Sequence, residues 1–117
     1  MSDTRRIGKE GEDICCQYLQ DNGYTIVERN FRCKEGEIDI IARDKTEWVF
    51  LEVKTRTNAH YGYPADAITE WKKRKMMKAV KFYLYFHRLE DAYIRIDMIE
   101  VHMEKEIGYI HHIKQVV

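Results

Sequence analysis

The chain has 117 residues, of which 44% are hydrophobic and 34% are charged, with 20 basic and 20 acidic side chains. This length suits a single domain spanning 1–117, and the composition is typical of a globular protein. No apolar run approaches the roughly 20 residues that span a bilayer, so we expect no membrane association. Because the net charge is zero, any surface that attracts a polyanion must be local.

The cysteines and the N-terminal segment predict a cytoplasmic protein. Cys15, Cys16 and Cys33 are odd in number and have no Cys-x-x-Cys spacing. We therefore expect reduced thiols rather than a disulfide framework or a zinc site. The first residues lead into no apolar segment, so no signal peptide is expected.

The first predicted element is a helix over 4–22. One stripe of this helix gathers Ile7, Gly11, Ile14, Cys15, Tyr18 and Leu19. The Asn22-Gly23 pair is a typical C-terminal signal. Glu12 lies about 100° from the centre of the stripe, at the edge of the buried face, from which it can reach a site on a neighbouring sheet. The alternative is a solvated acid in the Glu10 to Asp13 run.

A strand over 24–30 is followed by a predicted hairpin. Its arms, 36–43 and 48–54, are rich in Ile, Val, Phe and Trp, and a polar tetrad over 44–47 separates them. With the turn tip at 45–46, Asp39 faces Glu52 across the strands. Lys54 lies two residues beyond Glu52 and therefore shares its face.

Two carboxylates that face each other across apolar strands repel, unless a cation or a proton lies between them. Carboxylate oxygens suit Mg²⁺ or Mn²⁺, which can polarise a phosphate and lower the pKa of bound water. Lys54 is placed to orient that water or to stabilise developing charge. The alternative is a solvent-facing hairpin with a Glu37–Lys54 pair, which leaves the facing of Asp39 and Glu52 unexplained.

After a loop over 57–63, Pro64 predicts the first turn of a second helix that runs to about His87. This helix concentrates positive charge, in Lys72, Lys73, Arg74, Lys75, Lys78 and Lys81. Lys72 and Lys75 project onto its apolar face, where long stems can carry the ammonium groups to the rim and to phosphates. Arg56, on the face of Lys54, extends this basic strip. The alternative is a solvated cationic flank. Trp71 can stack on unpaired bases, although packing is the commoner role.

Two more strands are predicted over 95–102 and 109–117, with a turn within 104–108. In the first of them we assign Asp97 a structural role, through pairing with Arg95 or capping of a neighbouring strand. The order of helix, three strands, helix and strands predicts an α/β fold in which helices pack on a mixed sheet.

Five motifs carry a family resemblance: Gly8-x-x-Gly11-Glu12, Asn30-Phe31-Arg32, Gly36-Glu37-Ile38-Asp39, Glu52-Val53-Lys54-x-Arg56 and Lys72-x-x-Lys75-Met76. The chain resembles the YraN-type family of small bacterial proteins over nearly its whole length. That family is similar to the PD-(D/E)xK nuclease superfamily, closest to archaeal Holliday junction resolvases. In the superfamily motif a proline precedes the aspartate, whereas in this chain Ile38 precedes Asp39.

The resemblance implies a restriction-endonuclease-like fold, a mixed β-sheet flanked by helices. It implies that Asp39, Glu52 and Lys54 form a metal-dependent phosphodiesterase site. It also implies that Glu12 matches a first-helix glutamate and serves as a further catalytic residue and metal ligand. Mg²⁺ or Mn²⁺ is the expected cofactor.

We therefore predict a metal-dependent endonuclease that acts on DNA, including branched or flapped DNA. The basic residues Arg56, Lys72 and Lys75 are the predicted nucleic-acid contacts. One alternative is a nucleic-acid-binding module without catalysis, and another is an assembly partner in DNA processing that uses the helix over 64–87 as its contact. The pattern leaves DNA and RNA open as substrates. A homodimer would suit a symmetric junction.

Overall fold

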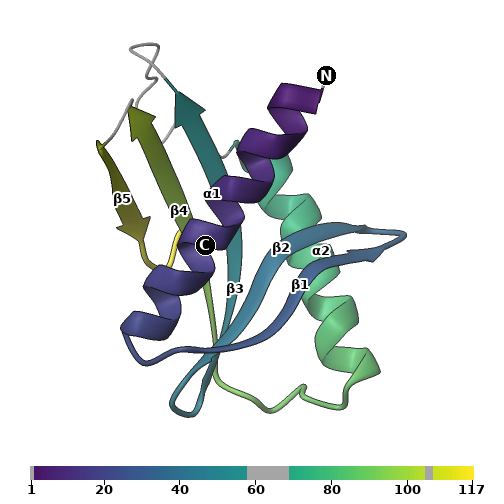
Figure 1. Cartoon of the computed structure of the whole chain (residues 1–117). Helices are drawn as coiled ribbons and strands as arrows, with labels where there is room; N and C mark the ends of the chain where they lie inside the picture. The colour runs from purple at the N-terminus through teal and green to yellow at the C-terminus, as the bar shows by residue number, and fades with distance from the viewer. Residues whose placement is uncertain (1, 58–68, 105–106) are drawn as a thin grey trace.

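A computed structural model of the chain describes residues 2–57, 69–104 and 107–117. The elements in chain order are α1 (Ser2–Asp21), β1 (Thr25–Cys33), β2 (Gly36–Asp44), β3 (Glu47–Thr57), α2 (Glu70–Phe86), β4 (Ile94–Glu104) and β5 (Ile107–Ile113). The five strands form one sheet in the order β1-β2-β3-β4-β5 (Figure 1). None of the described helices is long and apolar enough to cross a membrane.

The sheet is mixed because one of its pairings crosses over. β1–β2, β2–β3 and β4–β5 are antiparallel, whereas β3 and β4 are parallel and are connected through α2. A parallel pair needs such a crossover, usually a helix. The predicted α/β architecture of a mixed sheet flanked by helices is therefore confirmed, and it is consistent with a restriction-endonuclease-like fold.

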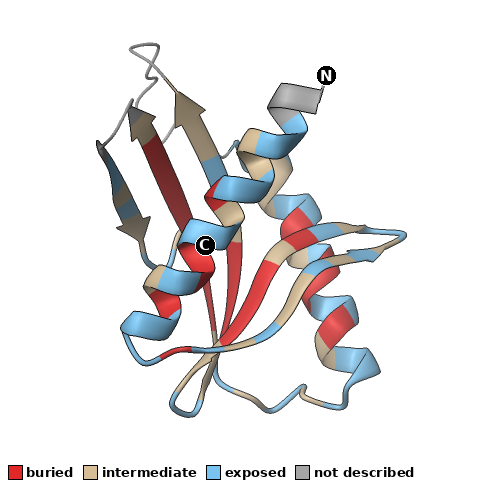
Figure 2. Ribbon diagram, in the orientation of Figure 1, coloured by how far each residue is buried: buried red, intermediate tan, exposed pale blue. Residues whose placement is uncertain are grey.

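Alternation along the central strands builds a hydrophobic core on each face of the sheet. On one face Leu19 of α1 packs with Val49, Leu51 and Ile99. On the other face, α2 packs against Phe50 and its neighbours in β2 and β4. Because helices cover both faces, the middle strands are buried on both sides, as Figure 2 shows for β3 and β4.

α1 differs slightly from the stripe that the sequence predicts. Cys15 and Leu19 are fully buried as expected, but Cys16 is buried and Ile14 is exposed. The buried face is thus rotated toward Cys16 by part of a turn. Gly23, with φ of +89°, ends the helix in the left-handed conformation that glycine favours.

α2 begins later than the sequence predicts. Thr69 has extended backbone angles and its side-chain hydroxyl accepts a hydrogen bond from the Lys72 amide, so it is the N-cap of a helix that starts at Glu70. The expected start at Pro64 was therefore wrong, because a capping threonine sets the boundary. Pro64 itself lies outside the described residues.

Candidate metal and phosphate site

The site is built where β2 leaves its partner β3. The pairing between these strands ends at Ile40 and Leu51, while β2 continues alongside β1. Ile38 packs on the α2 face, yet Ile40, two residues on, packs on the α1 face. The ribbon therefore turns at Asp39, opposite a stretch of β1 in which Asn30 has a φ of +55°.

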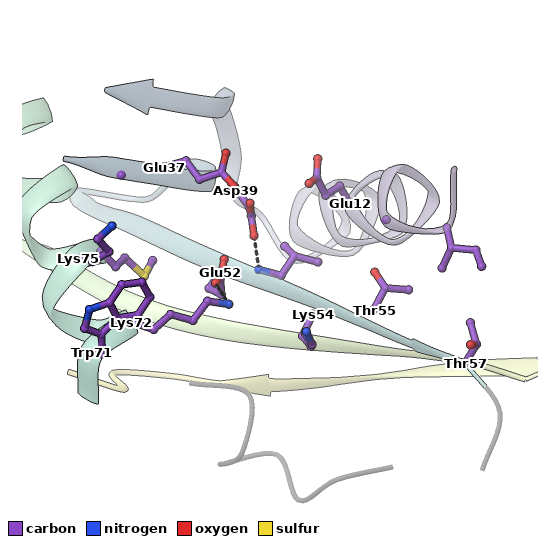
Figure 3. A pocket seen from close by; sticks show the side chains of 15 residues that line it. Glu12, Glu37, Asp39, Glu52, Lys54, Thr55, Thr57, Trp71, Lys72 and Lys75 are labelled. Carbon is purple, nitrogen blue, oxygen red and sulfur yellow. Dashed lines mark hydrogen bonds and ion pairs between the residues drawn. The ribbon is translucent and has the colours of Figure 1, made fainter. Parts of the chain in front are cut away.

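The turn points the Asp39 carboxylate at the backbone of β3. Its Oδ2 accepts a hydrogen bond from the Val53 amide at 2.8 Å, in place of a strand partner that β2 no longer supplies. The Glu52 side chain stands beside it, and Figure 3 shows both carboxylates between α1 and α2. The predicted register placed these two acids opposite each other, and the structure brings them together at the point where the strands separate.

The two carboxylates behave as a pair that holds one proton. Burial, the hydrogen bond with Glu52 and the charge of Glu52 together raise the pKa of Asp39 to about 8, against the lowering effect of the Val53 amide. Burial would also raise the pKa of Glu52, but hydrogen bonds with Asp39 and Lys72 and the positive charge nearby lower it overall. A protonated Asp39 thus donates to an ionised Glu52, which is the arrangement expected when two acids share a desolvated site.

Cationic side chains surround this acid pair. The Lys72 Nζ lies 2.8 Å from Glu52 Oε1. Lys54 and Lys75 line the same pocket, which has a volume of about 640 Å³. Trp71 also lines it and carries the Lys75 ammonium 4.7 Å from its ring centroid. The pocket therefore combines carboxylates at its centre with ammonium groups and an exposed aromatic ring at its rim.

Glu12 reaches the pocket from α1 because the helix approaches β3 closely. A Cβ atom on Gly11 would clash with the Thr55 side chain, so only glycine allows this approach. Gly8 has open space around it and makes no such contact. In this structure Glu12 pairs with Arg29, at 3.5 Å, rather than joining the acid pair. The sequence pattern gave no sign of this basic partner.

Arg56 and Glu37 have partners that the sequence analysis did not foresee. The Arg56 Nε donates to the fully buried Glu100 at 2.9 Å, and Arg56 is not among the pocket-lining residues. Glu37, on β2, pairs with Arg32 at 3.0 Å, because it lies opposite β1 rather than β3 at this position. The alternative of a Glu37–Lys54 pair was therefore wrong, since β2 has already left β3 at that position.

The donor set fits a divalent cation in its chemistry but is not assembled as a complete metal centre. Within residues 2–57, 69–104 and 107–117, no three His, Cys, Asp or Glu side chains gather closely enough to hold a metal ion. Asp39 and Glu52 supply two carboxylate groups with hard oxygen donors, and their mutual repulsion, which raises the pKa of Asp39, is what a cation would relieve. Glu12, on α1, lines the same pocket.

A family model matches the chain over residues 11–101, which include every residue of the acid pair and its lysines. The chain belongs to the uncharacterised protein family UPF0102. This result confirms the family membership that the motifs predict. The likeness of UPF0102 to nucleases stays a prediction.

UPF0102 proteins of several bacteria are similar to the chain over most of their length. The Geobacter metallireducens protein is 45% identical over 110 residues, which are 94% of this chain and 90% of that protein. A Clostridium botulinum protein is 50% identical over 99 residues, or 84% and 80% of the two chains. The Caldanaerobacter subterraneus protein is 42% identical over 102 residues, or 87% and 84%.

Among solved structures, SfsA of Pyrococcus furiosus in complex with Ca²⁺ is similar over 95% of this chain, which spans 63% of SfsA. The identity is 16% and the TM-score is 0.42. The crystal structure of SSO0001 gives 16% identity and a TM-score of 0.37, over 98% of this chain and 53% of that one. Likeness at this level carries no conclusion about function.

Proposed function

We propose that the protein is a metal-dependent endonuclease that hydrolyses phosphodiester bonds of DNA. The observation that supports this proposal is the acid pair. Asp39 and Glu52 are held beside each other, which raises the pKa of Asp39, and lysines line the same pocket. Holding two acids together is costly for a fold, and such sites are characteristic of cation-binding or catalytic groups.

In this proposal Asp39 and Glu52 hold Mg²⁺ or Mn²⁺. The metal would polarise a phosphate and supply an activated water at neutral pH. Lys54 is on the strand face of Glu52 and reaches the pocket without an ion-pair role in the acid pair. It would orient the water or stabilise the negative charge that develops on the phosphate.

Glu12 serves as the third carboxylate of the proposed site. Its approach is already secured by the close contact between Gly11 and Thr55. To join the metal, Glu12 has to exchange its ion pair with Arg29 for the cation. Arg29 keeps a second and shorter ion pair with Asp13, at 2.8 Å, so a divalent ion can drive this exchange without leaving the guanidinium unpaired.

The phosphate backbone would be held by Lys72 and Lys75. Both line the pocket from α2, on the side opposite Glu12 (Figure 3). Lys72 now neutralises Glu52, and a bound metal would free its ammonium group for a phosphate. Arg56 is left out of the proposed surface because Glu100 already binds its guanidinium.

A nucleic-acid-binding module without catalysis is the second candidate. The ion pair between Lys72 and Glu52 favours it, because this contact satisfies the acid without any metal. In that case Lys72 would neutralise Glu52 permanently, Asp39 would stay beside them without a metal, and the pocket lysines would bind phosphate without catalysis. An assembly partner that uses α2 as its contact is a third candidate, distinguished by the lack of both metal and DNA binding.

The deciding experiment combines a Mn²⁺ titration by calorimetry with cleavage of flapped, junction and linear DNA in Mg²⁺. We expect metal binding and cleavage by the natural chain and loss of both in Asp39→Asn. Glu37→Gln is the matched control, because Glu37 lies two residues away, lines the same pocket and is engaged with Arg32. Metal binding without cleavage by the natural chain would leave the binding module as the function.

A further inference from the structure

The outer face of α2 carries an ordered row of aromatic and basic side chains that the acid pair does not use. Trp71, Lys75, Lys78, Phe82, Tyr85 and Phe86 form this row, which we term the α2 stripe. At 100° per residue these positions fall within about 100° of the helix circumference. The opposite face of α2 is buried through Met76, Ala79, Val80 and Tyr83.

The aromatic rings of the α2 stripe are exposed to solvent. The exposed fraction is 59% for Trp71, 42% for Phe82, 73% for Tyr85 and 67% for Phe86. Single exposed apolar residues are common, but four large rings on one helix face form a patch of the kind that binds a partner. Phe82 and Phe86 are also parallel, with ring centroids 6.0 Å apart and planes 7° apart, so their faces are similarly oriented.

Positive charge decides which partner this patch fits. Lys75 and Lys78 lie between the rings, and the chain has no acidic residue from Trp71 to Leu89. A symmetric dimer through this face would bring the same lysines of two copies together, since a two-fold interface pairs a patch with itself. A polyanion with flat aromatic groups is instead complementary to both components of the patch.

The α2 stripe is continuous with the proposed site. Trp71 and Lys75 belong both to the stripe and to the lining of the pocket around Asp39 and Glu52. From Trp71 to Phe86 the helix rises by about 22 Å, which is enough for several unpaired nucleotides. A strand laid along α2 would therefore enter the pocket at the Trp71 end.

We propose that the α2 stripe binds an unpaired nucleic-acid strand, with bases stacked on its aromatic rings and phosphates on Lys75 and Lys78, and guides that strand into the pocket. This inference rests on the proposed function and specifies its substrate class. The substrate carries a single-stranded segment next to the bond that is cleaved, as in a flap or an overhang. Fully paired DNA offers no free base faces and would bind through its phosphates alone.

The test measures binding in EDTA, so that cleavage does not interfere. The probes are a labelled single strand of about 15 nucleotides, near the upper site size of one single-strand-binding fold, and the duplex of the same sequence. The variant is Tyr85→Ala/Phe86→Ala, which removes the two most exposed rings of the stripe. Tyr93→Ala is the matched control, because Tyr93 is equally exposed but lies beyond the helix.

We expect the double variant to bind the single strand at least about tenfold more weakly, because the stacking of bases on the two removed rings is lost. The affinity for the duplex should change little. Tyr93→Ala should bind both probes as the natural chain does. Equal single-strand affinity of the double variant and the natural chain would overturn the proposal. A change from dimer to monomer in the double variant, seen by sedimentation without a change in DNA affinity, would assign the patch to a second copy and would overturn it as well.

Failure of this inference is distinguishable from failure of the proposed function. If Asp39→Asn abolishes cleavage but the double variant cleaves flapped DNA normally, the endonuclease stands and the α2 stripe is not its strand guide. If single strands bind through the stripe but no substrate is cleaved in Mg²⁺, the stripe stands as a strand-binding surface and the endonuclease proposal fails.

Discussion

Two clusters of carboxylates that are wholly or partly buried differ in how their charge is balanced. On the α1 face the fully buried Asp97 accepts hydrogen bonds from Arg95 at 2.9 Å, from His112 at 2.7 Å and from the Gln115 amide at 3.0 Å. In the pocket between α1 and α2, Asp39 has one backbone donor and a second acid beside it. One cluster is complete, and the other needs a further positive charge.

The pKa shifts follow from this difference. Burial opposes ionisation of Asp97, but hydrogen bonds from His112, Arg95 and Gln115 outweigh it and lower the pKa of Asp97. Burial and the facing acid raise the pKa of Asp39 to about 8. Burial alone therefore does not identify a functional acid. The informative feature is a buried acid whose neighbours fail to neutralise it.

The largest expected effect on stability comes from removing Asp97, the centre of the hydrogen-bonded cluster with Arg95 and His112. Asp97→Ala should lower the free energy of unfolding by about 3 kcal/mol or more, because it leaves the buried Arg95 guanidinium with fewer counter-charges and His112 without its acceptor. Urea unfolding at pH 7 measures this. Asp91→Ala, an exposed acid before β4, is the control and should be close to neutral. Similar stability of the two variants would mean that the network is not structural.

At the Asp39–Glu52 site, Lys54→Ala should lower the rate of cleavage without lowering the stability of the fold. We expect cleavage to fall by about 10²- to 10³-fold, as when a group that stabilises developing charge is removed. The free energy of unfolding should change by less than about 0.5 kcal/mol, since Lys54 is exposed. Mn²⁺ binding should persist or strengthen, because an ammonium group repels the metal. Loss of Mn²⁺ affinity would contradict this division of roles.

Asp39→Asn should stabilise the metal-free protein, in contrast to Asp97→Ala. Asparagine keeps an oxygen for the Val53 amide and removes an acid that cannot ionise freely. Because the folded pKa of Asp39 is raised from 3.8 to about 8, its stabilising neutral form is complete below pH 4 and is lost as the pH rises toward 8. The advantage of the variant should therefore grow over this range, to roughly 1–3 kcal/mol at pH 8.

Denaturant unfolding in EDTA at several pH values tests this prediction. The natural chain supplies the reference at each pH, so that other titrating groups cancel in the difference. A variant that is less stable than the natural chain at pH 8 would show that the Asp39 carboxylate has a structural role. Excess Mg²⁺ should reverse the order, because the cation stabilises only the natural pair.

The smallest expected effect concerns the two pocket lysines of α2. Each phosphate contact adds about 0.9 to the slope of log affinity against log salt for duplex DNA. Lys75→Ala should flatten the slope by nearly that amount, whereas Lys72→Ala should flatten it less, because Glu52 already neutralises its ammonium group. Fluorescence anisotropy between low and moderate salt measures both, with Lys114→Ala as control. Equal slopes in the natural chain, Lys72→Ala and Lys75→Ala would exclude these two lysines of α2 from the phosphate contacts.

Local patterns in the sequence were sufficient to predict the elements of the fold. Alternating apolar residues and a polar tetrad specify the β2–β3 hairpin, and the observed pairing of Asp44 with Glu47 and of Ala42 with Val49 matches the predicted register. That register placed Asp39 and Glu52 together. The family motifs and the order of elements predicted the mixed sheet, because the parallel pair requires the connecting helix.

The pairing of Asp97 with Arg95 was predicted and is confirmed, but other side-chain partners could not be predicted in the same way. Arg29 beside Glu12, Glu100 beside Arg56 and Arg32 beside Glu37 all come from other strands or other stretches of the chain. The first two contacts join distant stretches of the chain, which no local spacing encodes. The third lies in the β1–β2 hairpin and was missed because β1 runs to Cys33, beyond the expected end at residue 30. The start of α2 was misplaced for a related reason, since a proline and a threonine cap both suit a helix start and only the folded backbone selects one.

The sequence by itself therefore determined the strands, the helices and which acids face each other, because these follow from periods of 2 and 3.6 residues and from short turns. Only the tertiary structure decided the electrostatic state of each acid. That state depends on burial and on charges contributed by distant segments, which act over a few ångströms in space and over dozens of residues in the chain. The same geometry left the aromatic and basic stripe of α2 exposed and continuous with the pocket.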